Sequence, residues 1–366
     1  MRVLHVLPTR ASDYGGPVRV AEALCGQLAL SGHTAEIFPA VDAPPLTATR
    51  VGYWPGIRAM SALSAQIRVA DLVHVHGLWT VPTSAASALA RAFERPYVIT
   101  AHGMLDRWSL RNHSARKKMY AALIERANLD AASALHFFNE EEHEEARSFG
   151  IRAPAFILPN GVHIAQLTDL PGREALWRQY PQARGKTVVL FLSRLHPKKG
   201  LRLLVPAFAR IGALSRTLLM IAGPDEGGHR AEVEALVARE GLRGRVIFTG
   251  AVTGEDKQRL LGGADLFVLP SYQEGDSVAV KEALAAGLPV VITHACHFSQ
   301  VAREPAGLVI DPSVQELQHA LEQLCGDDVL RARLAVNARP LIEREYTWDK
   351  LGTRLMQYYE KLLAQH

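Results

Sequence analysis

The chain has 366 residues, of which 48% are hydrophobic and 21% are charged, so it can form two domains with large buried cores. Its net charge of +4 at pH 7 agrees with an anionic substrate or an anionic surface, and we expect no nucleic-acid partner. Cys25, Cys296 and Cys325 form no C-x-x-C pair, which argues against a disulfide framework or a zinc site and favours a reducing compartment.

The chain begins with a short apolar run that predicts a strand at residues 2–8 and is too short for a signal peptide. Similar β-branched runs follow, and amphipathic segments with helical spacing separate them. The runs lie at 34–40, 71–77, 97–103, 134–139 and 155–161, and then at 187–195, 217–223, 246–252, 266–271, 289–295 and 307–312. The amphipathic segments include 18–31, 200–212, 229–241, 255–263 and 278–287, and only helices are expected after the last strand.

This alternation predicts an α/β protein with parallel sheets that helices cover on both faces. Twelve strands are too many for one ordinary doubly wound sheet, so we expect two sheets of about six strands. The pattern is weakest between Gly161 and Gly185, and we divide the chain there into domains at 1–165 and 166–345. The longest uncharged run, 72–90, contains His, Gly and Pro and is a poor membrane span, so we expect a cytoplasmic protein.

Ligands of open α/β sheets bind at the carboxyl ends of the strands. Several polar or glycine-containing turns follow predicted strands, so they lie at the carboxyl-end edge, or rim, of one of the two sheets. The two rims would face each other across a cleft. The turns are Gly15–Gly16, His76–Gly77, His102–Gly103, Asn160–Gly161, Arg194, Gly223 and Glu274.

The segment "SRLHPKKG" places Arg194 at the end of a strand and Lys199 just before Gly200, where a helix is expected to begin. A helix N-terminus has unpaired N–H groups, and two cations beside it would complete a phosphate site. The alternative is a basic surface turn without a ligand.

The segment "EGDSVAVKEAL" carries two glutamates eight residues apart, Glu274 in a loop and Glu282 in the helix that follows. The loop backbone could bind an anion while the carboxylates accept hydrogen bonds from sugar hydroxyls, as a sugar nucleotide would require. The alternative interpretation is that Asp276 or Ser277 only caps the helix and that Glu282 is a solvated helix residue.

Two further features lie in the first half of the chain. Gly15–Gly16 lets the backbone approach a phosphate or a sugar, although the segment lacks the G-x-G-x-x-G spacing and could equally be a tight turn. His102 could bond a hydroxyl or the reacting centre, or be a structural histidine, and His74, His76 and His163 have similar claims by position. The chain has no D-x-D and no H-E-x-x-H motif, so we expect no metal ion and no other cofactor.

These segments occur together with "AHG" at 101–103, "PNGV" at 159–162 and "GADLFVLPS" at 263–271. In this order they resemble the retaining GT-B glycosyltransferases of family four, the glycosyl transferases group 1, over nearly the whole chain. The resemblance implies two Rossmann-like domains that face each other across a cleft. It also implies that a C-terminal helix, 346–366, crosses back onto the N-terminal domain.

The resemblance further implies transfer of a sugar from a nucleoside-diphosphate sugar to an acceptor hydroxyl, with retained configuration and without an essential metal. It assigns the diphosphate to Arg194 and Lys199, the ribose to Glu282, and the donor sugar to Glu274 with the backbone of Gly275, Asp276, Ser277 and Val278. From the N-terminal domain, Gly15, Gly16 and His102 would close on the donor. The catalytic set is then His102, Arg194, Lys199 and Glu274.

The sequence departs from the family pattern at Asp276, where Phe or Leu is frequent, and at His163, where an acid is frequent. An anionic Asp276 would repel a diphosphate, so we expect its side chain to point away or to contact a hydroxyl. No carboxylate is clearly placed as a nucleophile, which favours front-face substitution, with the leaving phosphate taking the proton of the acceptor.

The region 104–126 resembles bacterial polysaccharide-assembly members, whose acceptors are saccharides or lipid-linked saccharides. Within it, 107–126 is basic and partly amphipathic, so it could lie on the anionic inner face of the cell membrane or form an ordinary solvated helix. A nucleotide-sugar epimerase, a phosphorylase with pyridoxal phosphate and a non-catalytic sugar-nucleotide-binding protein remain the alternative functions.

Overall fold

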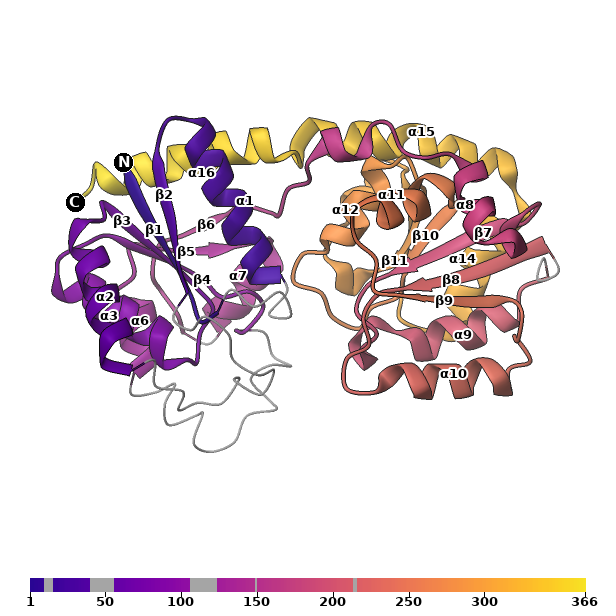
Figure 1. Cartoon of the computed structure of the whole chain (residues 1–366), viewed down its shortest axis with the longest axis horizontal. Coiled ribbons are helices and arrows are strands. Elements are labelled where there is room, and N and C mark those ends of the chain that lie inside the picture. The colour runs from indigo at the N-terminus through magenta and orange to yellow at the C-terminus, as the bar shows by residue number, and fades with distance from the viewer. Residues whose placement is uncertain (10–15, 40–55, 106–123, 149, 213–215) are drawn as a thin grey trace. The chain divides into compact units, whose positions relative to one another are not determined.

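The computed structural model describes residues 1–9, 16–39, 56–105, 124–148, 150–212 and 216–366, and it divides the chain into two compact units (Figure 1). Unit 1 consists of Met1–Asn160 together with Trp348–His366, and unit 2 is the continuous segment Gly161–Thr347. The C-terminal helix therefore belongs to unit 1. Each unit is described below by itself.

Unit 1 has one sheet of six parallel strands in the order β2-β1-β3-β4-β5-β6. The order reverses direction between β1 and β3, so this pair forms the topological switch point of the sheet. The strands are β1 (Arg2–Leu7), β2 (Thr34–Pro39), β3 (Leu72–His76), β4 (Tyr97–Thr100), β5 (Ala134–Phe137) and β6 (Ala155–Ile157).

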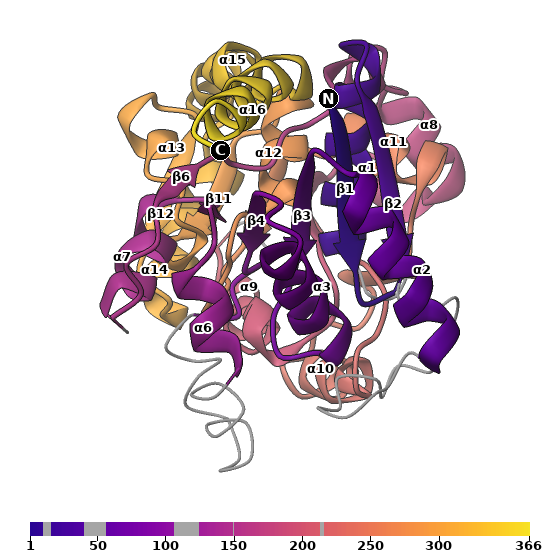
Figure 2. The same cartoon turned by 90° about the vertical axis from the view of Figure 1, so that its left-hand side faces the viewer.

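Helices cover both faces of this sheet (Figure 2). One face packs against α2 (Gly56–Val69), α3 (Val81–Ala92), α6 (Arg126–Asp130) and α7 (Glu140–Ser148). The other face packs against α1 (Gly16–Leu30) and the C-terminal α16 (Trp348–Leu363). Because consecutive residues of a strand point to opposite faces, β1 sends Leu4 and Val6 into the first core and Val3 into the second.

Unit 2 also has six parallel strands, in the order β12-β11-β10-β7-β8-β9. Numbered from its own first strand, this is the 3-2-1-4-5-6 order of dinucleotide-binding folds, and its switch point lies between β7 and β10. The strands are β7 (Thr187–Leu192), β8 (Thr217–Ala222), β9 (Val246–Gly250), β10 (Leu266–Leu269), β11 (Val290–Thr293) and β12 (Gly307–Ile310). The predicted twelve strands in two parallel sheets are therefore confirmed.

The sheet of unit 2 is likewise covered on both faces, with α9 and α10 below it and α8, α11, α12 and α15 above it in Figure 1. The helices are α8 (Arg173–Gln179), α9 (Leu201–Ala209), α10 (His229–Arg239), α11 (Gly254–Gly263), α12 (Val278–Ala285), α13 (Gln300–Arg303), α14 (Val314–Gly326) and α15 (Asp328–Glu345). Short 3₁₀ turns form η3 (Ile164–Leu167), η4 (Pro181–Ala183), η5 (Pro197–Lys199) and η7 (His294–Cys296).

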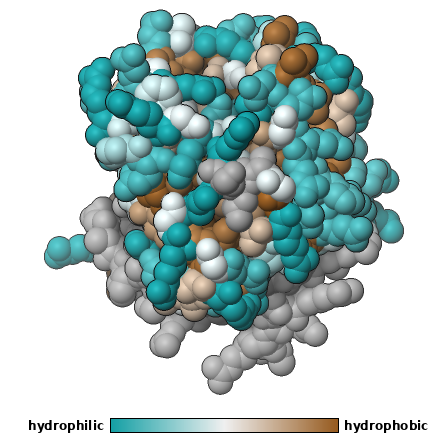
Figure 3. Space-filling model, turned by 90° about the vertical axis from the view of Figure 1, so that its right-hand side faces the viewer, coloured by the Kyte–Doolittle hydropathy of each residue, from teal (hydrophilic) through white to brown (hydrophobic). Residues whose placement is uncertain are grey.

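The surface of unit 2 seen in Figure 3 carries mainly hydrophilic side chains, with apolar ones scattered between them. Among the described residues, no helix combines the length and the apolar character needed to cross a membrane.

Candidate functional site

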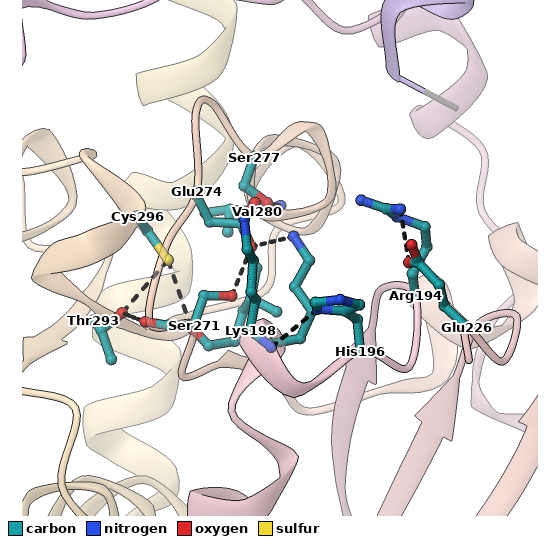
Figure 4. A network of polar contacts seen from close by, with 12 residues as sticks. Arg194, His196, Lys198, Glu226, Ser271, Glu274, Ser277, Val280, Thr293 and Cys296 are labelled. Atoms are coloured by element: carbon teal, nitrogen blue, oxygen red, sulfur yellow. Dashed lines mark hydrogen bonds and ion pairs between the residues drawn. The ribbon is translucent and has the colours of Figure 1, made fainter. Parts of the chain in front are cut away.

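The predicted phosphate and sugar segments of unit 2 lie at its switch point. "SRLHPKKG" (193–200) follows β7 and 270–277 follows β10, and these two strands are paired neighbours in the sheet. Figure 4 shows Arg194 and Glu226 on one side of this rim, Ser271, Glu274 and Cys296 on the other, and His196 and Lys198 between them. The rim is where an open parallel sheet binds its ligand.

Two glycines allow the loops of the rim to touch. Gly200 has a φ of +75°, and a Cβ there would lie 1.9 Å from the carbonyl oxygen of Pro270. Gly223 has a φ of +140°, and its Cβ would lie 1.8 Å from the carbonyl oxygen of Ser193. Any side chain at either position would push the loops apart, so both positions require glycine.

A nearly buried ion pair joins the two loops. The Lys199 ammonium donates to Oε1 of Glu274 over 2.6 Å, and their side chains are 13% and 8% exposed. The Ser271 hydroxyl donates to the same oxygen over 2.6 Å, and the backbone N–H of Glu274 donates to the carbonyl of Ala295. A cation and a carboxylate are thus held together where little water screens them.

The nearby thiol of Cys296 does not take part in this chemistry. Burial is the main cause that raises its pKa to about 12, and the negative charge of Glu274 adds to the effect. Because the thiolate is the nucleophilic form, this cysteine is inert at neutral pH.

Arg194 lies at the open side of the rim. Its guanidinium donates to Glu226 over 2.7 Å, and the two side chains are 55% and 42% exposed. An exposed ion pair of this kind is weak, so the guanidinium can exchange Glu226 for an anionic ligand at little cost. Burial lowers the pKa of the neighbouring His196, whose Nδ1 accepts from the backbone of Lys198.

Ser277 and Glu282 each make a hydrogen bond near or on α12. Ser277 caps α12 by accepting from the N–H of Val280 over 3.5 Å. Glu282 lies on α12 and accepts from the Lys257 ammonium over 2.7 Å, with side chains 18% and 23% exposed. The expected cap is therefore present, and Glu282 is paired and mostly buried rather than solvated.

The side chain of Asp276 is paired with a lysine of α12. Both of its carboxylate oxygens accept from the Lys281 ammonium, over 2.5 and 2.6 Å. The acid that departs from the family pattern thus has its charge balanced by a lysine five residues further along the chain. Lys281 was not singled out from the sequence, although a charged residue among the apolar positions of α12 is the signal that could have revealed it.

Among the described residues of unit 1, five histidines lie on the sheet face that α1 and α16 cover. They are His5 on β1, His74 and His76 on β3, His136 on β5, and His102 two residues after β4. His74, His76 and His102 were candidates from the sequence. His5 and His136 were not, although the alternation of their strands places them on the same face. His163 is in unit 2, in the turn that precedes η3.

The proton positions in part of this histidine cluster follow from its hydrogen bonds. Nε2 of His136 is 2.7 Å from the carbonyl of Leu158 and must donate to it, so Nδ1 accepts from the Thr100 hydroxyl over 2.8 Å. Thr100 in turn accepts from Nε2 of His74 over 2.6 Å, and Nδ1 of His74 accepts from the Tyr359 hydroxyl over 2.5 Å. This chain connects α16 to β6 through the interior.

A second chain leads to His102. Nδ1 of His5 lies 2.9 Å from Nε2 of His76, and Nδ1 of His76 lies 3.1 Å from Nε2 of His102. One nitrogen from each of His5, His74 and His76 lies within 4.8 Å of the others, as in a metal site. Because Tyr359 and Thr100 already occupy both nitrogens of His74, the arrangement is a hydrogen-bond network.

Burial keeps these histidines neutral. It lowers the pKa of His5 and His102 to about 3 and that of His136 to about 4. It also lowers the pKa values of His74 and His76 well below the ordinary value, with the other histidines adding to the effect. His102 has a positive φ of 52°, an uncommon conformation outside glycine.

Two predicted features lie largely outside the described residues. They are Gly15 of the glycine pair and the basic segment up to residue 123. Gly16 is the first residue of α1, and a Cβ there would meet nothing within 4 Å.

Comparison with known families decides the kind of protein. The model described as Glycosyl transferases group 1 matches residues 173–340, and the Glycosyl transferase 4-like domain matches 15–161. The chain belongs to the group 1 glycosyltransferases. The Glycosyl transferase 4-like match lies in unit 1 apart from its last residue, and the Glycosyl transferases group 1 match lies in unit 2. The rim described above lies within the group 1 match.

Curated group 1 relatives are distant. The GDP-mannose-dependent alpha-(1-6)-phosphatidylinositol monomannoside mannosyltransferase of Mycobacterium tuberculosis is 27% identical, with 87% of this chain and 85% of that protein covered. The uncharacterized glycosyltransferase MJ1607 of Methanocaldococcus jannaschii is 29% identical over 47% of this chain. The chain spans only 44% of MJ1607 and 50% of the alpha-D-kanosaminyltransferase of Streptomyces kanamyceticus.

Solved structures agree over almost the whole chain. Anabaena Alr3699/HepE, in complex with UDP and glucose, has a TM-score of 0.80 at 18% identity and covers 99% of this chain and 100% of its own. WaaG, a glycosyltransferase involved in lipopolysaccharide biosynthesis, has a TM-score of 0.74 at 20% identity, with 97% and 98% covered. Together with the two sheets, these structures establish the two-domain GT-B fold of this group 1 chain.

Proposed function

We propose that this protein transfers a sugar from a nucleoside-diphosphate sugar to an acceptor hydroxyl in polysaccharide or glycolipid assembly. The observation that carries the proposal is the rim of unit 2, where the Lys199–Glu274 pair and the exposed Arg194 lie on loops at the switch point of a nucleotide-type sheet. The names of relatives support it, since one uses GDP-mannose and one structure holds UDP and glucose.

In this proposal the two cations hold the diphosphate. Lys199 exchanges Glu274 for phosphate oxygens, and the exposed Arg194 exchanges Glu226. Glu274, freed from its cation, accepts from hydroxyls of the donor sugar, while Glu282 accepts from the ribose. The backbone from Gly275 to Val278 holds the donor sugar together with Glu274, and the Asp276 side chain makes no donor contact.

We propose front-face substitution with retention. The acceptor oxygen bonds to the anomeric carbon as the bond from that carbon to the diphosphate oxygen breaks on the same face, and the acceptor proton passes to the departing phosphate. Negative charge grows on the diphosphate, so Arg194 and Lys199 act most strongly at the transition state. A contact of His102 with the donor stays a prediction.

The proposal is tested first with donors. A thermal-shift panel of UDP-, GDP-, ADP- and CDP-sugars should give one nucleotide that stabilises the protein, because a ligand that binds only the folded state raises its melting temperature. NMR of the product from that donor and a saccharide or lipid-linked acceptor should show the donor's anomeric configuration. An inverted product would refute retention, and failure of every sugar nucleotide to bind would refute the function.

Two further measurements address the finer predictions. Activity should survive EDTA, because cations take the place of a metal at the diphosphate, and rescue of a lost activity by magnesium or manganese would contradict this. Release of an epimerised sugar nucleotide without an acceptor would favour the epimerase instead. An inner-membrane-face location, with the segment 107–126 on anionic lipid, stays a prediction.

A further inference from the structure

Asp276 and Lys281 form the most buried ion pair at the rim of unit 2 among the residues that the structure describes. The Lys281 side chain is 1% exposed and that of Asp276 is 11% exposed. Asp276 is two residues from Glu274 and Lys281 directly precedes Glu282, so in the sequence the pair lies between the two proposed donor carboxylates. Asp276 therefore belongs to the loop that the proposed function assigns to the donor.

The ammonium of Lys281 is held from a second side by aromatic rings. It lies 4.9 Å from the ring centroid of Tyr346 and 5.7 Å from that of Phe298, and the two rings meet edge to face. The backbone of Tyr346 is itself fixed, because its carbonyl accepts from the N–H of Val162 over 2.9 Å. Lys281 therefore presents its charge to Asp276 from a fixed position.

The pair explains how this chain carries an acid in its donor loop. A carboxylate two residues from the proposed sugar ligand would repel a diphosphate if its charge were not balanced. Burial lowers the pKa of Lys281, and the charge of Asp276 together with its hydrogen bond opposes that effect.

We propose that Lys281 is a positioning residue for donor binding, which neutralises Asp276 and holds the loop 274–278 in the form that accepts an anionic sugar nucleotide. The inference rests on the proposed function. It differs from a purely structural role in one respect: the two partners are not equivalent. Loss of the Lys281 cation leaves the unbalanced Asp276 carboxylate beside the phosphates of the donor. Loss of the Asp276 carboxylate leaves no such anion there.

The test measures the donor affinity of Lys281→Met, Asp276→Asn and the double variant by calorimetry. The donor is UDP-glucose or GDP-mannose, whichever the wild type binds more tightly. Lys281→Met should weaken binding by roughly tenfold or more, because removal of one partner of a buried pair uncovers the other charge. Asp276→Asn should bind as tightly as the wild type or more tightly. The double variant should regain affinity to within roughly threefold of the wild type, and the loss in Lys281→Met should shrink at high salt.

Arg173→Met is the matched control. Arg173 pairs with Asp265, whose side chain is 2% exposed, at the start of β10 and so at the opposite edge of the same sheet. This variant also removes the cation from a buried carboxylate, and it should lower the melting temperature without changing donor affinity.

Three results would overturn the inference. They are unchanged affinity in folded Lys281→Met, equal weakening in both single variants in step with their melting temperatures, and failure of the double variant to regain affinity. If Lys281→Met does not fold, Asp276→Asn and the double variant test the inference. Weakened donor binding in both of them would contradict the neutralisation of Asp276 by Lys281. If the wild type binds neither UDP-glucose nor GDP-mannose, the comparison uses the sugar nucleotide that the thermal-shift panel identifies, and failure of every sugar nucleotide to bind would instead refute the proposed function and this inference with it.

Discussion

Lys199 and Glu274 come from loops that follow two different strands, yet their charged groups lie 2.6 Å apart at the rim of unit 2. In this pair, each charged group occupies the position at which the other would bind a group of the ligand. A diphosphate can replace the carboxylate, and a sugar hydroxyl can replace the ammonium. The pair therefore holds both groups at the rim until a donor separates them.

Loss of either rim cation should slow the transfer. Lys199→Ala or Arg194→Ala should cost about 2–4 kcal/mol of transition-state stabilisation in kcat/KM, because charge develops on the leaving diphosphate. Arg194→Lys should recover little of this, since an ammonium cannot reproduce the guanidinium fork. Arg202→Ala, which removes an exposed arginine paired with Glu232, is the control and should leave kcat/KM unchanged. Near-wild-type kcat/KM in both alanine variants would contradict the assignment of the diphosphate to these two cations.

The two glutamates should divide the donor between them. Glu282→Ala should weaken the bare nucleoside diphosphate, and Glu274→Ala should weaken the intact sugar nucleotide far more than the bare one. Each loss should amount to roughly 1.5–3 kcal/mol, the value of a charge-assisted hydrogen bond. Titration of each variant with both ligands measures the division, and equal losses for both ligands would contradict it.

Gly200→Ala should separate the loops of the rim. The substitution combines a positive φ with a clash against the backbone of Pro270, so we expect a loss of at least about 2 kcal/mol in the free energy of unfolding and loss of donor binding. Gly287 is the matched control, because its φ is +82° but a Cβ there would meet nothing within 4 Å. Urea unfolding should show a clearly smaller loss for Gly287→Ala, and equal losses would exclude the clash as the cause.

Acid should destabilise unit 1 before carboxylates are protonated. The buried histidines have folded pKa values far below 6.5, so as pH falls from about 7 to 5 the unfolded chain binds protons that the folded chain does not. Each such histidine contributes a loss of about 1.4 kcal/mol per pH unit below 6.5 and none above it. Burial raises the pKa of Glu125, which acts in the opposite direction as a single group.

Hydrogen exchange of unit 1 amides between pH 5 and 7, corrected for the intrinsic rate, measures this loss. His136→Gln should make the pH dependence shallower, because it removes one titrating group from the unfolded chain. A free energy of opening that does not change over this range would contradict the assignment.

The sequence was sufficient for features that depend on neighbours along the chain. Apolar runs of β-branched residues predicted all twelve strands, and the turns after those strands led to Arg194, Lys199 and Glu274 as rim residues. Parallel strands bring their carboxyl ends to one edge, so the rim required no knowledge of side-chain contacts.

The partners at the rim could not be predicted in this way. Glu226 follows β8, Lys257 belongs to α11 and Lys281 to α12, and nothing in local spacing tells which carboxylate each will meet. The domain boundary was placed by weak patterning at 165, whereas the units divide after Asn160. The repulsion argument for Asp276 treats its charge singly, whereas the structure pairs that charge with Lys281.

Unit 2 is inserted into unit 1 as one continuous segment, since the chain enters it at Gly161 and leaves it after Thr347. During synthesis, unit 2 has its complete sequence before unit 1 does. The face of the first sheet that α1 and α16 share stays incompletely covered until α16 emerges and Tyr359 can reach His74. Trp348–His366 therefore complete the core of unit 1, and a chain without them should retain the proposed donor rim while the sheet of unit 1 loses the cover of α16.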